Sequence, residues 1–412
     1  MTGVLSGMRV VEGSAFVAVP LAGMTLAQMG AEVIRFDRIG GGLDAKRWPV
    51  APGGQSLFWD GLNKGKKSIA VDMKSPEGRE LVTRIVTAPG DDAGLFITNL
   101  RVRGWMDHET LSQHRDDLVM VTLTGDRKGR PQVDYTVNPS LGIPHMTGPE
   151  GSGPVAHALP AWDIAAGNMV VSALLAAERH RLRTGQGQEV EFSLKDAAAA
   201  TIGHLGMLAE AKMSGRSRPK AGNALYGAYG QDFVCADGAR IMVIGLTERQ
   251  WGGIVKATET DTQMQTLEAE HGCSLRDEGT RWRLRHEITA ILAPWFAARP
   301  KPVIAALFDE KGLTWAPFRT LPEALSEDAD LGPDNPMFEM MNQPGIGQYP
   351  VAGSVFNFGS HSREKPVAAP ILGAHTEEVL TEVAGCDDRE VARLFDKGIV
   401  AQAVTQADLN AA

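Results

Sequence analysis

Near its beginning the chain carries the apolar run Met8-Arg9-Val10-Val11-Glu12-Gly13, followed after a helical segment by Gly30-Ala31-Glu32-Val33-Ile34-Arg35-Phe36-Asp37. Both runs have the length and the β-branched content of buried strands. The segment between them, Pro20 to Met29, favours a helix, because proline suits the first helical turn. Strand, helix and strand in this order predict the opening of a doubly wound, Rossmann-like α/β sheet. A dinucleotide site is poorly supported, because no GxGxxG motif follows the first run.

The same alternation of apolar runs and helical patterns continues along the chain. It predicts further strands at 69–72, 94–99, 118–123 and 188–194, and helices at 75–87, 163–184 and 196–213. A polar, basic stretch at 214–222 marks a domain boundary. Beyond it we expect a hairpin at 233–244, helices to about residue 308, a strand-like segment at 314–319, short β segments at 337–358, and two closing helices at 376–383 and 388–397.

Composition limits the function classes. The chain has 412 residues, of which 43% are hydrophobic and 22% are charged, as in globular proteins. A net charge of −9 argues against binding of nucleic acid. Its three cysteines are far apart in the sequence, which argues against a disulfide framework or a metal site. Polar residues interrupt the apolar stretch 16–34, and the start lacks a signal-peptide pattern, so we expect no membrane association and a cytoplasmic protein.

One acidic residue stands out in Leu159-Pro160-Ala161-Trp162-Asp163-Ile164-Ala165-Ala166-Gly167. Asp163 comes after a loop rich in glycine and proline and directly before a long apolar helical pattern that ends at Thr184-Gly185. Its position is that of a helix N-cap, which would give it only a structural function. Whether Asp163 has a chemical function as well is not decided by its position, and the rest of the chain is needed to decide it.

Basic residues gather beside the predicted strand ends, where ligands bind in open α/β sheets. Each of them could equally be a solvated surface charge. The set is Arg38, Lys64, Lys66, Lys67, Arg101 and Arg103.

Several motifs together resemble the family III CoA-transferases, which include formyl-CoA transferase, carnitine CoA-transferase and the 2-methylacyl-CoA racemases. The resemblance runs from about residue 4 to residue 400. Its segments are 8–12, 30–35, Asn63-Lys64-Gly65-Lys66-Lys67-Ser68-Ile69 with Asp72, and Ser75-Pro76-Glu77-Gly78. Within the family, segments 10–18, 134–139, 159–163 and 223–227 are similar to members that move CoA between the C1 and C4 carboxyl groups of mesaconate.

This resemblance implies a large domain built from both chain ends, a smaller α+β middle domain and an interlocked homodimer. The expected division is 1–213 for the N-terminal part of the large, CoA-binding domain, 214–325 for the small domain with its linkers, and 326–412 for the C-terminal part, which returns to the large domain. Asp163 is implied as the nucleophile, and an acyl-CoA thioester as the substrate, with no permanently bound cofactor and no metal. The residues implied around CoA are Arg38, Lys64, Lys66, Lys67, Asn99, Leu100, Arg101 and Arg103.

The resemblance leaves several activities open. The leading hypothesis is intramolecular CoA transfer on mesaconate through a covalent aspartyl intermediate. The alternatives are an intermolecular CoA-transferase for another small acid, a 2-methylacyl-CoA racemase, and a non-catalytic CoA-binding protein. Racemisation is disfavoured, because Val133 stands where the racemases have a histidine. Candidates for the acyl pocket are Val17, Arg47, Trp48, His145, Tyr226 and Tyr229, although the histidine could be a turn residue and both tyrosines could be packing residues.

Overall fold

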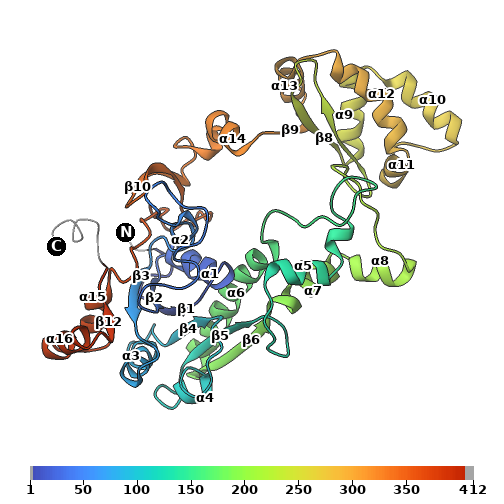
Figure 1. Ribbon diagram of the computed structural model, residues 1–412. Helices are drawn as coiled ribbons and strands as arrows, with labels where there is room; N and C mark the ends of the chain where they lie inside the picture. The colour runs from blue at the N-terminus through green and yellow to red at the C-terminus, as the bar shows by residue number, and fades with distance from the viewer. Residues whose placement is uncertain (1–2, 404–412) are drawn as a thin grey trace. The chain divides into compact units, whose positions relative to one another are not determined.

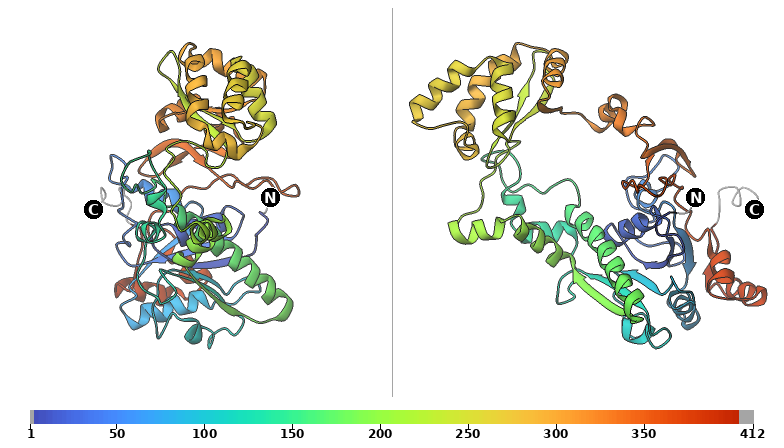
Figure 2. Two further views of the ribbon diagram at one scale, coloured as in Figure 1. Left: turned by 90° about the vertical axis from the view of Figure 1, so that its right-hand side faces the viewer. Right: turned by 180° about the vertical axis from the view of Figure 1, so that it is seen from behind.

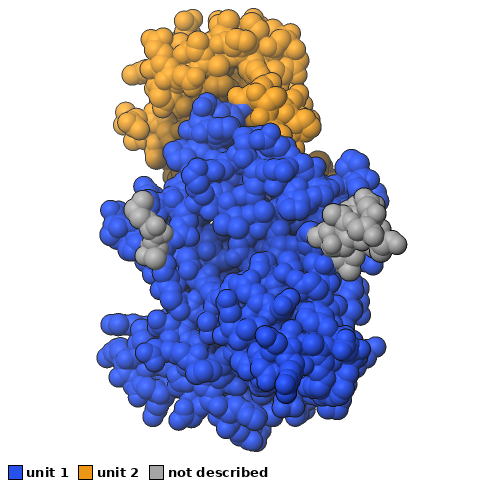
Figure 3. Space-filling view, turned by 90° about the vertical axis from the view of Figure 1, so that its left-hand side faces the viewer, with its two compact units in different colours: residues 1–141, 158–210, 328–412 blue, residues 142–157, 211–327 orange. Residues whose placement is uncertain are grey.

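The computed structural model describes residues 3–403 and divides into two compact units. Unit 1 contains residues 1–141, 158–210 and 328–412, and unit 2 contains residues 142–157 and 211–327 (Figure 3). Segment 142–157, which the expected division counts with the large domain, belongs to unit 2. The ammonium group of Lys220 donates to the carbonyl oxygens of Pro144 and Thr147, and the amide of Gly222 donates to the carbonyl of Gly148. These contacts hold the segment within unit 2.

Unit 1 is built on an open sheet, as predicted (Figure 1). The strand order is β12-β3-β2-β1-β4-β5-β6, and β1 to β6 are parallel while the short β12 is antiparallel to β3. Connections run outward in both directions from β1 and β4, so the topological switch point lies between these two strands. The strands are β1 (Arg9–Gly13), β2 (Glu32–Asp37), β3 (Lys67–Val71), β4 (Leu95–Thr98), β5 (Val119–Thr124), β6 (Gln188–Ser193) and β12 (Val400–Ala401).

Helices of unit 1 begin and end where local signals predict. Ser75 caps α3 by accepting from the amide of Gly78, and Gly185 ends α6 in the left-handed region at φ +72°. The predicted helix 196–213 is two helices, because the chain turns at Gly206 with φ +76°. The helices are α1 (Ala18–Ala27), α2 (Leu57–Leu62), α3 (Pro76–Val86), α4 (His108–Leu111), α5 (Asp134–Ser140), α6 (Ala161–Thr184), α7 (Leu194–His204), α15 (Thr376–Glu382), α16 (Asp388–Asp396) and the 3-10 turn η2 (Ala329–Leu331), with α8 (Met207–Ser214) crossing into unit 2.

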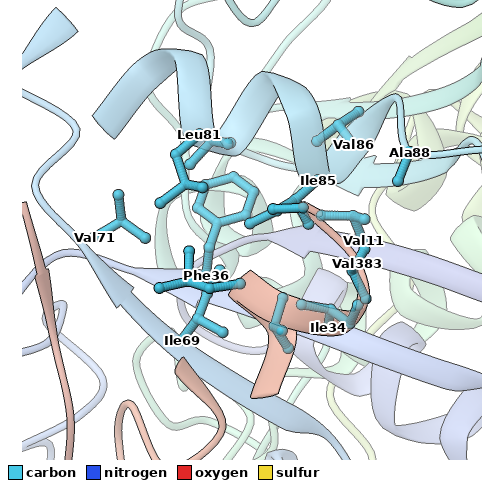
Figure 4. Close-up of a cluster of buried hydrophobic side chains, with 14 of the residues drawn as sticks. Val11, Ile34, Phe36, Ile69, Val71, Leu81, Ile85, Val86, Ala88 and Val383 are labelled. Atoms are coloured by element: carbon cyan, nitrogen blue, oxygen red, sulfur yellow. The ribbon is translucent and has the colours of Figure 1, made fainter. Parts of the chain in front are cut away.

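A cluster of buried apolar side chains covers one face of this sheet (Figure 4). It joins Phe36 and Ile69 of the central strands to Leu81 and Ile85 of α3. The C-terminal α15 contributes Val379 and Leu380, and α15 lies beside β3, so the two ends of the chain share one core. Burial of this apolar area is the main stabilising contribution to the unit.

The other face is covered by α1 and α6, which lie side by side (Figure 2). Their approach depends on Gly167, since a Cβ at this position would be 2.6 Å from the carbonyl oxygen of Ala18. The contact fixes the first turns of α6 against the first turn of α1. A hairpin of β10 (Phe338–Gln343) and β11 (Gly347–Ala352) completes the unit.

Unit 2 is an α+β unit with its own core, in keeping with the expected fold class. An antiparallel sheet of β7 (Tyr229–Val234), β8 (Arg240–Gly245) and β9 (Thr314–Pro317) packs against helices, and Phe296 stacks on Phe233 with ring centroids 4.0 Å apart. Its helices are α9 (Glu248–Thr258), α10 (Asp261–His271), α11 (Glu278–Arg283), α12 (Arg285–Ala297), α13 (Lys301–Glu310), α14 (Leu321–Glu327) and the 3-10 turn η1 (Ile143–His145).

Candidate active site

A cavity of about 790 Å³ lies in unit 1 at the carboxyl ends of the central strands. Its walls come from the turns after β1, β4 and β5 and from the start of α6, and these segments surround the switch point between β1 and β4. An open α/β sheet forms its ligand crevice at this point. Several residues of the sequence-predicted site line the cavity: Val17, Arg47, Trp48, Asn99, Leu100, Arg101 and Asp163.

Asn99 holds the two central strands together at the edge of the cavity. Its side-chain oxygen accepts from the amide of Ala15 at 2.9 Å, and its Nδ2 donates to the carbonyl oxygen of the same residue at 2.8 Å. The next residue, Phe16, has φ +65°, a conformation that side chains other than glycine rarely adopt. One residue earlier, the buried Arg35 donates to the carbonyl of Ser14 at 3.2 Å. The backbone directly before the strained Phe16 is therefore held by two side chains.

Asp163 lies in the first turn of α6 and is not its N-cap, which is a correction to the capping interpretation. The helix begins at Ala161, and the residue at the N-cap position, Pro160, supplies no side-chain acceptor. Asp134 supplies it instead, since its Oδ2 accepts from the amides of Trp162 at 2.8 Å and Asp163 at 3.4 Å. The carboxylate of Asp163 is thus left for the cavity, and no hydrogen-bond donor contacts it within residues 3–403.

Both burial and charge act on this carboxylate. Burial raises the pKa of Asp163 from its usual 3.8 to about 7, and the negative charge of Asp134 adds to the effect. A carboxylate that is poorly solvated and held beside a second one has a high free energy in its ionised form. Conversion to a neutral derivative, by protonation or by acylation, relieves that cost.

Arg47 brings positive charge to an aromatic wall of the cavity. Its guanidinium carbon lies 5.5 Å from the ring centroid of Phe16 and 5.2 Å from that of Phe58. Such a flat cation between two rings has a restricted orientation while its N–H groups stay accessible to a carboxylate. Next to it, Trp48 is 79% exposed, so its indole is available to a bound molecule.

The residues expected around CoA divide into three groups. Asn99, Leu100 and Arg101 follow β4 and line the cavity. Arg38 and Arg103 follow β2 and β4 and are exposed, but they do not line it.

The three lysines lie elsewhere: Lys64 and Lys66 precede β3 and Lys67 is its first residue, so all three are at the amino end of that parallel strand. The ammonium group of Lys66 is buried 2.8 Å from Glu12 Oε2, and burial lowers its pKa to about 8. Lys64 donates to the carbonyl of Gly61, and Lys67 pairs with Glu32 at 2.7 Å. These interactions are internal to the protein, and CoA binding by the three lysines stays a prediction from the sequence.

The remaining pocket candidates belong to unit 2. Tyr229 is fully buried, and its hydroxyl is 3.0 Å from that of Thr289. Tyr226 packs against Trp282 with ring centroids 4.9 Å apart, whereas His145 is exposed at the end of η1. Tyr229 therefore acts in packing within its own unit.

Sequence reasoning missed part of the cavity wall. Arg130, Gln132 and Tyr135 line the cavity from the segment after β5, together with Asp134. The signal was present, because a polar loop after a predicted strand lies at the ligand edge of such a sheet. Helix α5 was not predicted, since Pro139 lies inside it and obscures the helical pattern.

No cluster of three or more His, Cys, Asp or Glu side chains among residues 3–403 could hold a metal ion. No helix in this range has both the length and the apolar character needed to cross a membrane.

Comparisons with known proteins give a consistent result. A family model described as CoA-transferase family III matches residues 5–376. The chain is 55% identical over 403 residues to 2-methylfumaryl-CoA isomerase of Chloroflexus aurantiacus, covering 97% of this chain and 98% of that protein. It is 26% identical to succinyl-CoA:glutarate CoA-transferase of Mus musculus, covering 98% and 91%.

The fold has solved counterparts. A CAIB/BAIF family protein from Brucella suis matches 93% of this chain and all of its own chain, with a TM-score of 0.76 at 23% identity. Rv3272 from Mycobacterium tuberculosis matches 91% of this chain and 98% of its own, with a TM-score of 0.73 at 21% identity. The family model, the relatives and the parallel sheet with an aspartate at its switch-point cavity agree, and the chain belongs to the family III CoA-transferases.

Proposed function

We propose that this enzyme moves CoA between the C1 and C4 carboxyl groups of mesaconate, as a 2-methylfumaryl-CoA isomerase. The observation that carries the proposal is the carboxylate of Asp163 in the switch-point cavity of a chain 55% identical to an isomerase of that name. An aspartate suits this reaction because it forms covalent intermediates that divide one difficult exchange into easier steps.

The reaction begins with attack of an Asp163 oxygen on the C1 thioester carbon. A C–O bond forms, the C–S bond breaks, and CoA leaves as its thiolate, which gives a mixed anhydride. The thiolate then attacks the aspartyl carbonyl carbon, releasing mesaconate and leaving an Asp163–CoA thioester. The C4 carboxylate attacks this thioester, and the same two steps in reverse transfer CoA to C4 and restore Asp163. No electrons are exchanged with an external donor, and the protein carboxylate is regenerated.

Intramolecular transfer requires that free mesaconate is held between the two halves of the reaction. Arg47 is the residue we assign to its spare carboxylate, since the two rings beside its guanidinium restrict the direction of its N–H groups. Val17 and Trp48 line the same cavity and supply apolar contact for the methyl-substituted double bond. His145 and Tyr226 stay predictions from the sequence.

CoA itself needs concentrated positive charge, because the chain as a whole is acidic. We assign its nucleotide and pantetheine parts to the turn after β4, with Asn99, Leu100 and Arg101, and to the exposed Arg38 and Arg103. CoA enters and leaves as part of the substrate. The interlocked homodimer stays a prediction from the family resemblance, and the cytoplasmic location stays a prediction from the sequence.

The decisive experiment follows the isomers directly. Purified protein is incubated with the C1 thioester alone, and the products are separated by chromatography. We expect the C4 thioester to form without an added acceptor, and isotopically labelled free mesaconate to enter the product only slowly. Asp163→Ala abolishes turnover and the hydroxylamine-trapped aspartyl group, while Asp387→Ala, at an exposed helix start, keeps both. Absence of the C4 thioester would refute the proposal.

The same assay tests the alternatives. Transfer between separate acids, as the name of succinyl-CoA:glutarate CoA-transferase states for that relative, predicts an absolute requirement for a second free acid. Racemisation predicts exchange of an α-proton in deuterated water, and Val133 in the cavity wall cannot exchange a proton. A non-catalytic CoA-binding protein predicts that Asp163→Ala changes no measurable property.

A further inference from the structure

The start of α6 depends on a carboxylate from another helix. The amides in the first turn of a helix have no partner within the helix, and Pro160 offers no side-chain acceptor. Asp134, the first residue of α5, accepts from the amides of Trp162 and Asp163 through its Oδ2, at 2.8 and 3.4 Å. It is 1% exposed, so this oxygen is held inside the protein. An aspartate from outside the helix therefore does the work of a cap.

A second contact from the same helix fixes the same residue. Asn138, one turn along α5, accepts from Nε1 of Trp162 at 3.1 Å. Trp162 is consequently held by its backbone through Asp134 and by its indole through Asn138, and its side chain is buried. Because Trp162 immediately precedes Asp163, the two contacts determine the direction in which the Asp163 side chain leaves the helix.

The arrangement also places a second negative charge next to the nucleophile. The charged or titratable side chains that line the cavity are Arg47, Arg101, Arg130, Asp134, Tyr135 and Asp163. Arg130 pairs with Asp126 at 2.6 Å, and Arg101 is 4.0 Å from Glu191. Arg47 lies against the rings of Phe16 and Phe58. None of these arginines forms an ion pair with Asp163 among the described residues, and the charge of Asp134 contributes to the high free energy of the Asp163 carboxylate.

We propose that Asp134 is a positioning residue that also favours acylation of Asp163: it fixes the nucleophile through the backbone, and its charge raises the free energy of the Asp163 carboxylate. The inference rests on the proposed function. When an Asp163 oxygen bonds to the thioester carbon and the C–S bond breaks, the negative charge moves from the aspartate to the CoA sulfur. The repulsion between the two carboxylates exists only before this step, so its relief shifts the equilibrium toward the acylated enzyme.

Asp134→Asn removes the negative charge but keeps the hydrogen bonds that position Asp163, because the amide oxygen can still accept from both backbone amides. The mid-point of the acid limb of kcat/KM moves to lower pH in this variant, and KM for mesaconyl-CoA stays within about twofold of the wild-type value. The equilibrium constant for formation of the enzyme–CoA thioester falls in this variant. It is measured by intact-protein mass spectrometry at fixed ratios of mesaconyl-CoA to mesaconate. The shift of the acid mid-point and the fall of the equilibrium constant both result from removal of the same charge. A shift of one pH unit therefore corresponds to a tenfold smaller equilibrium constant for the enzyme–CoA thioester.

Asp134→Ala removes the acceptor as well. We expect a larger loss of kcat than in the asparagine variant and faster hydrogen exchange of the Trp162 and Asp163 amides, whose protection Asp134→Asn retains. Asp387→Asn, at an exposed helix N-cap, is the control and changes neither the pH profile nor the adduct. An unchanged adduct equilibrium in folded Asp134→Asn, or equal amide protection in Asp134→Ala and wild type, overturns the inference. If wild-type enzyme forms no adduct, it is the proposed function that fails.

Discussion

Replacement of Asp163 by asparagine should stabilise the folded protein, and increasingly so as the pH rises. The carboxyl of Asp163 has a pKa of about 7 in the folded protein, against its usual 3.8, because it is buried and lies beside Asp134. A carboxyl whose pKa is raised by folding does not destabilise the folded protein at a pH below its pKa in the unfolded chain. The loss of stability grows between the unfolded-state pKa and the folded-state pKa, and it is constant at higher pH. Asparagine has the same shape and carries no charge, so the variant avoids this cost.

The magnitude follows from the size of the shift. A change from 3.8 to about 7 corresponds to at most about 4 kcal/mol, since each pKa unit is worth about 1.4 kcal/mol. Partial exposure of Asp163 to the cavity and the cost of burying an amide reduce the expected gain to about 1–2 kcal/mol at pH 8. In a protein of this size the gain corresponds to a rise in Tm of roughly 1–3 °C. At pH 5 most of the wild-type carboxyl is protonated, and the gain is less than half as large.

Scanning calorimetry of wild type, Asp163→Asn and Asp387→Asn at pH 5 and pH 8 measures these differences. Asp387→Asn removes one carboxylate from an exposed helix start and so corrects for the general effect of lost charge. A variant that gains equally at both pH values, or that is less stable than wild type at pH 8, would refute the assignment of a high free energy to the Asp163 carboxylate.

The other predictions concern activity and packing. The rate constant kcat/KM should rise with pH and reach half of its plateau near pH 7, because Asp163 attacks only in its ionised form; a pH–rate profile with an acid mid-point near pH 4 would contradict this. Arg47→Lys should lower kcat/KM by roughly tenfold, because lysine keeps the charge but lacks the planar guanidinium whose N–H donors are oriented by the rings of Phe16 and Phe58. Steady-state kinetics measures the change, with Arg249→Lys at an exposed position as the control. Gly167→Ala should destabilise the protein by about 1–3 kcal/mol, because the added Cβ meets the carbonyl of Ala18 at 2.6 Å, and chemical denaturation with Gly252→Ala, whose Cβ would meet nothing within 4 Å, as control would detect it.

The sequence determined the elements of the large unit and the class of chemistry. Fully apolar runs such as Val10-Val11 and Val33-Ile34 are typical of parallel strands covered on both faces, and the structure has them as β1 and β2. Local signals also sufficed for single boundaries, such as the cap at Ser75 and the turn at Gly185. The motifs that carry the family resemblance identified Asp163, because a short motif is a property of neighbouring residues.

Tertiary structure decided which side chains share a cavity, which are buried, and how far their pKa values are shifted. Lys66 has the same local signal as Arg101, yet one is buried against Glu12 and the other lines the cavity, because the two lie at opposite ends of their strands. The contact between Asp134 and the start of α6 joins residues 28 and 29 positions apart, and no local pattern predicts it. Burial and neighbouring charge raise the pKa of Asp163, and both depend on groups that only the folded chain brings together.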